Sequence, residues 1–563
     1  MGRRCHLSFL LMLASTCLSC VGCTNNTSVT SSTPAIESAA SVWFRPLPTD
    51  SGFDFVHSLG SERRYWIPET VSGGVALLDY DGDGDLDIYC VQAGGTLAGD
   101  RSDAPGNRLF RNDGQLHFTD VTDQAGVGDQ GFGMGASCCD IDRDGDIDIF
   151  VSNVGQDVLY INRGDGTFED GTATSGLGDA GFSASAAFRD LDGDRFPELF
   201  VSRYLLWSPD KELTCGSGLG EDYCSPNNYQ APAPDLFYKN NADGTFTNIS
   251  ESAGLRTAYG NGLGVVFADF DDDGRQDVYV ANDGSPNQMW RNLGDLMFKE
   301  MAVTNGCAVN LNGSAEAGMG LQASDLDEDG DLDLFMTHIR NETNTWYRND
   351  HGIFADATLL TGLASSSRDM TGFGMGFQDF DHDGILDLFV ANGRVLRVRD
   401  SLAGDDPYAE PDQLFRGLGG VRFSEVSPRG GLDSALQYTG RGVAFGDLDD
   451  DGDQDIIVIN NNGPAILMVN EAQKLGASVT FTVTDKDGAI ALGARLEVHC
   501  QQRVLHRLVA RGYSYCASND PRVHVGLASA DQVDKVIVRW LDGTSSEHGP
   551  YQGGSFASIQ QSP

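Results

Sequence analysis

Positive charge is scarce in this chain. Its 563 residues carry 38 Lys and Arg against 82 Asp and Glu, which gives a formal net charge of −44. Nucleic-acid phosphates and anionic lipid surfaces would repel so acidic a protein, so we expect no nucleic-acid partner and no adsorption to a membrane surface. Hydrophobic residues at 40 % and aromatics at 9 % suffice for a packed core, so this is not a disordered acidic chain. The composition favours cations as ligands.

Recognisable catalytic motifs are missing. The ten histidines are scattered, and none has metal-ligand spacing to a cysteine or to another histidine. There is no G-x-S-x-G elbow, no P-loop and no H-E-x-x-H. His57, His338 and His382 stand alone, and His382 occupies a variable loop position from which we expect it to point to solvent. We therefore expect no enzyme, and no catalytic residue or organic cofactor is predicted.

Long apolar runs are missing beyond the N-terminus. Residues 1–23 have a positively charged start and an apolar stretch well short of the ~18 residues that span a bilayer, which predicts a signal peptide. Its end resembles a bacterial lipobox with Cys23 as the lipidated residue and Cys20 as the alternative; a plain secretory signal is the other interpretation. Residues 24–41 are rich in Ser and Thr and predict a flexible tether. We expect a secreted or envelope-anchored protein, a bacterial lipoprotein, that meets the membrane only through its lipid.

Eight cysteines lie beyond residue 23. In an oxidising compartment, proximity within one segment predicts the disulfides Cys215–Cys224 and Cys500–Cys516. The pairing of the other four is open, with buried free thiols as the simpler interpretation; these are Cys90, Cys138, Cys139 and Cys307.

An acidic loop recurs seven times between apolar strands. Its pattern is D-x-D-x-D-G-x-x-D, and the copies begin at Asp79, Asp140, Asp190, Asp269, Asp325, Asp379 and Asp447. A second motif lies between the loops, for example LFRNDGQLHF from Leu109: an apolar pair, a polar turn and an aromatic residue predict a β-hairpin. Each repeat thus supplies about four short strands. Seven repeats predict an all-β fold, a seven-bladed β-propeller over residues 42–470.

The propeller also has a predicted closure and two insertions. The seventh repeat lacks its last strand, and Val42-Trp43-Phe44 resembles the missing segment, so we expect it to join the last blade to the first. The insertions fall at residues 204–234 and 394–411. The first carries aromatic residues and is either a recognition surface or a structural cover over a blade.

The acidic loops predict calcium sites. Ca²⁺ takes six to eight oxygens, and carboxylates at loop positions 1, 3, 5 and 9 with the carbonyl of position 7 supply them. Two carboxylates ~4 Å apart repel by about 4 kcal/mol at an effective dielectric of ~20, and the loops hold 35 of the 82 acidic residues. We expect six to seven Ca²⁺ ions. The third loop should bind most weakly or stay empty, because Arg195 replaces glycine, Pro197 stiffens the turn, and the Arg195 charge partly substitutes for the ion.

The predicted ligands share these five loop positions. In the first four loops they are Asp79, Asp81, Asp83, Asp85 and Asp87; Asp140, Asp142, Asp144, Asp146 and Asp148; Asp190, Asp192, Asp194, Phe196 and Glu198; and Asp269, Asp271, Asp273, Arg275 and Asp277. In the last three they are Asp325, Asp327, Asp329, Asp331 and Asp333; Asp379, Asp381, Asp383, Ile385 and Asp387; and Asp447, Asp449, Asp451, Asp453 and Asp455.

The composition changes after Asn470. Residues 471–563 hold nine Lys and Arg and nine Asp and Glu, so the acidic surplus lies upstream. Alternating apolar runs predict a small β-rich domain there; they are Val479–Val483, Leu496–Cys500, Val523–Val525 and Val536–Trp540.

These motifs together resemble FG-GAP/VCBS-type repeat proteins, whose propellers are of the integrin-α kind. PETVSGGVALLDYDGDGDLD, VANDGSPNQ and RGVAFGDLDDDGDQD are among the segments that carry the resemblance. From about residue 42 to 560 the chain is similar to bacterial relatives of cartilage acidic protein, and GARLEV and VRWLDGT resemble their C-terminal ASPIC/UnbV domain. The resemblance implies a secreted or surface-attached, calcium-binding, non-catalytic protein.

Two functions from different classes remain. The first is a calcium-rigidified binding or adhesion scaffold that meets an extracellular protein or polysaccharide through its loops. The alternative is a hydrolase or lyase that acts on an extracellular polymer in the propeller channel.

Overall fold

The computed structural model describes residues 42–48, 50–60, 63–94, 97, 105–399, 406–433 and 436–563. The predicted signal peptide (1–23), the tether (24–41) and the lipidation candidates Cys20 and Cys23 lie outside the described residues. Among the residues described, no helix is long and apolar enough to cross a membrane.

The described strands of residues 42–470 form seven four-stranded antiparallel units, numbered here in chain order; a two-residue pairing joins units 2 and 3 into one sheet. Units 1 and 2 are β2 (Val75–Leu78), β3 (Asp87–Cys90), β4 (Arg108–Asn112), β5 (Phe118–Asp120) and β6 (Phe132–Cys139), β7 (Asp148–Gly155), β8 (Val158–Asn162), β9 (Phe168–Asp170). Units 3 and 4 are β10 (Gly181–Arg189), β11 (Glu198–Arg203), β14 (Leu236–Asn240), β15 (Phe246–Asn248) and β16 (Gly262–Ala268), β17 (Asp277–Asn282), β18 (Gln288–Asn292), β19 (Phe298–Glu300). Units 5 and 6 are β20 (Leu321–Ser324), β21 (Asp333–Met336), β22 (Thr345–Asp350), β23 (Ile353–Asp356) and β24 (Gly372–Gln378), β25 (Asp387–Asn392), β27 (Gln413–Gly417), β28 (Phe423–Glu425). Unit 7 is β30 (Gly440–Gly446), β31 (Asp455–Asn460), β32 (Ile466–Asn470) and β1 (Phe44–Pro46).

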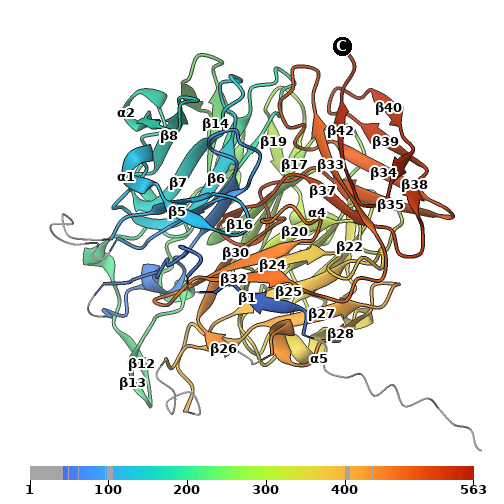
Figure 1. Ribbon diagram of the computed structural model, residues 1–563. Coiled ribbons are helices and arrows are strands. Elements are labelled where there is room, and N and C mark those ends of the chain that lie inside the picture. Colours follow the sequence, from blue (N-terminus) through green and yellow to red (C-terminus); the bar gives the residue numbers. More distant parts are fainter. Residues whose placement is uncertain are drawn as a thin grey trace, which may run out of the picture. The chain divides into compact units, whose positions relative to one another are not determined.

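The units form a closed series. The first strand of each unit contacts the first strand of the next, and β30 of unit 7 contacts β2 of unit 1. The predicted closure is confirmed: β1 pairs antiparallel with β32, with Phe44 opposite Asn470, and Figure 1 places the blue β1 beside the orange strands of unit 7. Because closure leaves no long free edge, this β-propeller avoids the edge-to-edge pairing that open sheets risk.

Small residues in the first strands, or directly before them, allow these strands to come close together. A Cβ on Gly320 would lie 2.0 Å from the carbonyl oxygen of Phe373, and one on Gly442 would lie 2.4 Å from that of Gly73. Second strands such as β17 and β25 are buried along their whole length, because neighbouring units pack on both faces. Their nearly continuous apolar sequences follow from that burial.

An asparagine at the end of the third strand connects neighbouring units. The Asn162 side-chain amide donates to the carbonyl of Tyr80 in unit 1 at 2.9 Å, and Asn349 donates to that of Phe270 in unit 4 at 2.8 Å. Asn112, Asn240 and Asn470 make the equivalent bond. This asparagine ends the segments F-R-N, Y-I-N, Y-K-N, Y-R-N and M-V-N of the five units concerned, so a residue of the hairpin motif also links its unit to the acidic loop of the unit before it.

Short elements occupy the connections. The helices are α1 (Thr122–Ala125), α2 (Thr172–Ser175), α3 (Pro226–Tyr229), α4 (Ala302–Asn305) and α5 (Ala364–Ser367), with the 3-10 turns η1 (Ile67–Thr70), η2 (Pro209–Lys211), η3 (Leu255–Thr257), η4 (Thr358–Leu360) and η6 (Arg429–Gly431). One small hairpin, β12 (Cys215–Ser217) with β13 (Gly220–Asp222), belongs to the first insertion. A short antiparallel pair, β26 (Glu410–Pro411) with β29 (Gln437–Tyr438), joins the end of the second insertion to the segment before unit 7.

The C-terminal region is a β domain, and the four predicted strands are present. One sheet has the order β37 (Val523–Gly526), β33 (Ser478–Thr484), β42 (Ser555–Gln560), and a second has β35 (Arg503–Leu508), β34 (Arg495–Cys500), β39 (Lys535–Arg539), β40 (Ser545–His548). The pair β38 (Gln532–Val533) and β41 (Tyr551–Gln552) completes it. Phe481, Val498 and Val536 belong to one buried core.

One disulfide prediction is confirmed and the other is wrong. Cys215 and Cys224 are bonded, whereas Cys500 and Cys516 are buried free thiols. Cys500 ends β34 inside the C-terminal domain, but the chain leaves that domain before Cys516, which packs against Ser185 of the propeller. Nearness in sequence did not reveal that excursion. The four cysteines left open above are also free and buried.

Phe44 provides a test of the closure. Its side chain is fully buried and packs edge-to-face on Phe380, with ring centroids 5.1 Å apart. We expect Phe44→Ala to lower the free energy of unfolding by about 3–5 kcal/mol, through lost burial and a cavity. Chemical denaturation measures this, with the half-exposed Val42→Ala as the matched control. A loss below about 1 kcal/mol would contradict a closing role for β1.

Candidate metal centres

The seven acidic loops share one backbone-bonded frame. In every loop the carboxylate at position 1 accepts the N–H of position 6, at 2.8 to 3.2 Å. The carboxylate at position 5 accepts the N–H of position 7, as Asp83 does from Asp85 at 2.9 Å. These bonds curl the chain around its own acidic side chains. In the third loop Arg195 adopts a φ of 79°, in the left-handed region that glycine enters freely and arginine does not.

The predicted ligand positions converge in space. One carboxylate oxygen from each of Asp79, Asp81 and Asp87 lies within 4.8 Å of the others. The second, third and fourth loops contain equivalent groups: Asp140, Asp142 and Asp148; Asp190, Asp192 and Asp194; and Asp269, Asp271 and Asp273. At position 7 the side chain varies among Asp, Phe, Arg and Ile, which suits a position that would contribute only its carbonyl.

The acid at position 9 has a second role. Asp87 accepts the N–H of Tyr80 at 2.9 Å and that of Asn112 at 2.8 Å, so it joins the loop to the third strand of its unit. Asp148 makes the same two bonds with Ile141 and Asn162. Position 9 therefore holds the loop in place whether or not it also contacts a cation.

The donor set fits a hard divalent cation. At position 3, one oxygen each of Asp271, Asp327 and Asp381 is buried and has no hydrogen-bond partner. A buried carboxylate oxygen without a partner is costly, and an array of such oxygens is the environment that Ca²⁺ prefers. In the third loop the unpartnered buried oxygen is on Glu198, at position 9.

Basic residues on the third strands partly neutralise the loops, which the sequence reasoning missed. Arg348 reaches Asp327 at 2.6 Å and Asp329 at 2.9 Å, at positions 3 and 5 of the fifth loop. Arg291 and Arg416 do the same in the fourth and sixth loops. The signal lies in the hairpin motif, where a basic residue precedes the asparagine or glycine in FRN, YKN, WRN, YRN and FRG.

The third loop is neutralised differently from the prediction. Arg195 points to Asp487 of the C-terminal domain rather than into the loop. The cation that meets the loop carboxylates is Lys239, which pairs with Asp192 and lies 3.8 Å from Asp194. The prediction that Arg195 supplies the substituting charge is therefore wrong, and Lys239 pairs with the third loop as the third-strand arginines pair with theirs.

Burial raises the pKa of the position-9 acids. The pKa of Asp87, Asp148 and Asp277 rises to about 8 in each case, because desolvation outweighs the backbone N–H groups that favour the ionised form. Neighbouring loop carboxylates raise each pKa further by repulsion. The metal-free loops therefore carry a free-energy cost when they are fully ionised.

His382 does not point to solvent as predicted. It is 4 % exposed, its Nε2 lies 3.1 Å from Asp453, and its ring packs on His524 of the C-terminal domain at 4.9 Å between centroids. The loop position that looked variable and exposed in the sequence lies at a domain contact.

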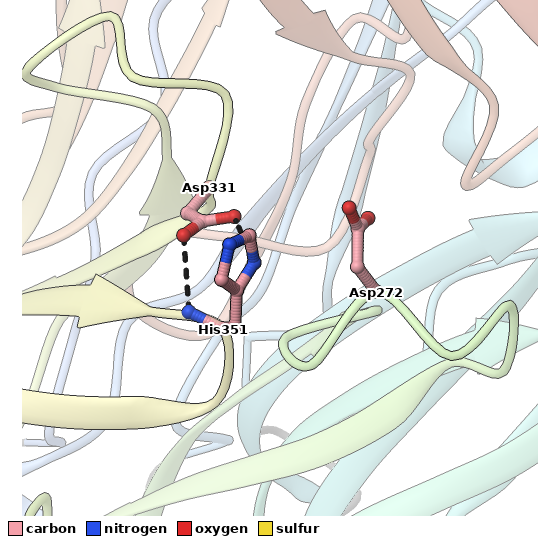
Figure 2. Close-up of side chains that lie close together, drawn as sticks. All are labelled: Asp272, Asp331 and His351. Atoms are coloured by element: carbon pink, nitrogen blue, oxygen red, sulfur yellow. Dashed lines mark hydrogen bonds and ion pairs between the residues drawn. The ribbon is translucent and has the colours of Figure 1, made fainter.

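A mixed group forms where the fourth and fifth loops meet. Figure 2 shows Asp272 facing Asp331 and His351, whose ring nitrogen Nδ1 lies 3.2 Å from Asp331. Asp272 is already paired with Arg495 at 2.6 Å. The guanidinium therefore supplies positive charge at this junction between loops.

A segment of the C-terminal region fills the centre of the propeller. Residues 511–520 contact first strands of six units: β36 (Ala517–Ser518) pairs with β2, and Ser514 exchanges backbone hydrogen bonds with Leu321 of β20. Further contacts reach β6, β10, β24 and β30, among them Met375 N–H to the Ser514 hydroxyl at 3.0 Å and Phe445 N–H to Asn519 at 3.0 Å. We call residues 511–520 the central plug.

The insertion at 204–234 packs against two other segments. The Tyr223 hydroxyl donates to Glu69 at 3.1 Å, and the Tyr408 hydroxyl donates to Asp222 at 2.8 Å. Three segments, 63–70, 204–234 and 394–411, thus interlock through their described residues, and we call them the cap. Because the first insertion joins second and third strands, the cap lies at the opposite end of the strands from the acidic loops.

The pKa shifts predict an unusual pH dependence. Because folding raises the pKa of Asp87, Asp148 and Asp277 from near 4 to about 8, the metal-free folded state binds more protons than the unfolded chain between these values. Stability in EDTA should be highest near pH 4–5 and fall as pH rises through 8, and excess Ca²⁺ should oppose the fall because it binds deprotonated carboxylates. Urea midpoints at pH 5 and pH 8 measure this.

A matched pair of variants controls that measurement. Asp87→Asn removes one buried acid and should flatten the slope in EDTA, whereas Asp123→Asn, at an exposed position of α1, should not. A metal-free protein as stable at pH 8 as at pH 5 would contradict this account of the loops.

Comparisons with known proteins agree with this architecture. The profile of the FG-GAP-like repeat family matches residues 79–151, 140–201, 224–280, 269–336 and 325–390, and that of ASPIC and UnbV matches residues 484–563. Cartilage acidic protein 1 of Xenopus tropicalis is 24 % identical over 483 residues, which are 84 % of this chain and 61 % of that protein. The Homo sapiens protein of the same name is 24 % identical over 337 residues, 58 % of this chain and 39 % of that protein. The chain thus spans about three fifths or less of these relatives.

Likeness to solved structures is looser. An Agrocybe aegerita lectin described as recognising non-reducing terminal N-acetylglucosamine has a TM-score of 0.38 at 16 % identity, covering 65 % of this chain and 82 % of its own. The exotype rhamnogalacturonan lyase YesX has a TM-score of 0.32 at 14 % identity, covering 92 % of this chain and 91 % of its own. The family rests on the repeats instead: their matches span half of the chain and coincide with the acidic loops and strands described above. The chain belongs to the FG-GAP-like repeat family and carries a C-terminal ASPIC/UnbV domain.

Proposed function

We propose that this protein is a calcium-binding β-propeller scaffold, secreted or anchored to the cell envelope, that binds an extracellular protein or polysaccharide. The observation that carries the calcium part is the convergence of carboxylate oxygens in repeated loops, several of them buried without a partner. Bound Ca²⁺ would supply the positive charge that offsets the repulsion among these carboxylates. The chain's own contribution is a frame of backbone N–H groups that holds the carboxylates together.

The cap is the proposed surface for the partner. It combines a disulfide-closed hairpin with the half-buried rings of Trp66 and Trp207, whose centroids lie 5.9 Å apart. Aromatic residues held by a rigid frame are suited to protein and sugar surfaces alike. Tyr223 is buried, so the inner part of the cap serves as a structural cover. We therefore assign recognition to the exposed rim of the cap.

The alternative, a hydrolase or lyase in the propeller channel, is less well supported. Its substrate would have to occupy the space where the central plug contacts six first strands. Protein and glycan arrays with and without calcium, run beside a polymer-hydrolysis screen, separate the two. Calcium-dependent binding that is lost in Trp207→Ala supports the scaffold. Hydrolysis of a polymer by the wild type that one substitution at the channel abolishes would overturn the scaffold proposal.

Calcium removal should weaken the whole fold. Extracellular calcium modules bind with Kd of about 10⁻⁴–10⁻³ M, so at ten times Kd each site contributes about 1.4 kcal/mol, and six or seven contribute roughly 8–10 kcal/mol. We expect EDTA to lower the melting temperature by roughly 10 °C or more, as measured by calorimetry. An unchanged melting temperature would contradict the calcium assignment.

Substitutions at position 1 test individual loops. Asp140→Ala should reduce the calcium stoichiometry by one in isothermal titration. Asp190→Ala should leave it unchanged, because Arg195 replaces the position-6 glycine of the third loop and Pro197 stiffens its turn. Loss of a site in Asp190→Ala would show that the third loop is occupied in the wild type.

A further inference from the structure

Position 4 of the acidic loops, which does not face the proposed ligand, contacts the C-terminal domain. In five loops it adopts a left-handed backbone conformation with φ between 55° and 67°. The residues concerned are Arg143, Asp272, Glu328, His382 and Asp450. Each of them touches a side chain of the C-terminal domain.

Two arginines of the C-terminal domain bridge neighbouring loops in the same way. Arg503 pairs with Glu328, at position 4 of the fifth loop, at 2.9 Å, and donates to the carbonyl of Gly384, at position 6 of the sixth loop, at 2.7 Å. Arg495 pairs with Asp272 of the fourth loop at 2.6 Å and donates to the carbonyl of Gly330 in the fifth. Each guanidinium thus links position 4 of one loop to position 6 of the next.

The same link occurs between the second and third loops with the roles exchanged. Here the arginine is itself position 4: Arg143 donates to the carbonyl of Arg195, at position 6 of the third loop, at 3.0 Å. The C-terminal domain supplies the acid, Asp485, at 2.7 Å. The same geometry recurs whichever domain supplies the guanidinium. This recurrence indicates that the loops require a bridge between position 4 of one loop and position 6 of the next.

The sixth loop is the most closely covered. A Cβ on Gly526 of β37 would lie 2.0 Å from a carboxylate oxygen of Asp379, at position 1 of that loop. The N–H of Ala528 donates to the carbonyl of His382 at 3.0 Å, and that of Leu475 donates to the carbonyl of Asp381 at 2.7 Å. In the first loop, by contrast, Asp81 and Asp83 are exposed.

We propose that Arg495 and Arg503 are positioning residues for calcium binding, so that the calcium affinity of the fourth, fifth and sixth loops depends on the docked C-terminal domain. Each arginine holds the carbonyl at position 6, one peptide before the carbonyl assigned to the cation. Because the two equilibria are linked, docking of the C-terminal domain and calcium binding strengthen each other by the same factor. This inference rests on the proposed function.

Charge and positioning have to be separated in the test, because removing Arg503 alone leaves Glu328 unpaired and increases the attraction for a cation. The double variant Glu328→Gln/Arg503→Gln keeps the net charge of the wild type and removes the bridge. Arg503→Lys keeps the charge and loses the planar fork. Glu497→Gln/Arg539→Gln deletes a charge-neutral pair at 2.6 Å within the C-terminal domain and serves as the matched control.

Calcium titration of the full chain by calorimetry gives the first result. We expect both Arg503 variants to bind calcium about fivefold more weakly at two of the sites, with the other sites and the control variant unchanged. If both variants bind as the wild type does, the inference is overturned while the proposed function stands. If the wild type binds no calcium, the inference and the proposed function are both contradicted.

Hydrogen exchange gives a second result that needs no variant. Because docking and calcium are coupled, amides of the central plug should exchange at least fivefold faster in EDTA than in saturating calcium. Faster exchange at the plug than at β39, inside the C-terminal domain, would identify undocking rather than unfolding of that domain. Equal plug exchange in the two conditions would overturn the inference.

Discussion

Electrostatic repulsion inside the acidic loops is the constraint on which the rest of the structure depends. Four to six carboxylates share each nine-residue loop, and each like-charged pair at ~4 Å costs about 4 kcal/mol at an intermediate dielectric. The described structure meets this cost in three ways: backbone N–H groups bond the acids at positions 1, 5 and 9, third-strand side chains such as Arg348 pair with positions 3 and 5, and C-terminal arginines offset position 4. The proposed calcium ions are the fourth.

The same constraint relates the propeller to its C-terminal domain. A separate domain beside a propeller could be connected by a linker alone, yet here the domain contacts the loop face and sends the central plug through the ring of first strands. Tyr515 illustrates the depth of that insertion, since its hydroxyl donates to the carbonyl of Val71 at 2.6 Å and its ring packs on Phe373. The fold of the propeller and the docking of the domain therefore depend on shared residues.

Much of the fold follows from the sequence because its signals are local and repeated. The alternation of an acidic loop with a hairpin motif predicted the strands, and the segment beginning at Val42 predicted the closing strand, since edge pairing needs only a matching apolar pattern. The positions of the candidate ligands were equally local. What local patterns could not provide is the path of the chain between distant segments. The Cys500–Cys516 prediction failed because residues between them leave the domain, and the His382 prediction failed because a surface residue of a repeat becomes buried when another domain covers it.

The metal content of the purified full chain tests the account most directly. After equilibrium dialysis against buffer whose free calcium is about ten times the expected Kd, elemental analysis of the two compartments should find six or seven calcium ions bound per chain, with little magnesium or zinc. Fewer than one calcium per chain would contradict the account, because the loops would then have to tolerate their crowded carboxylates with protein groups alone.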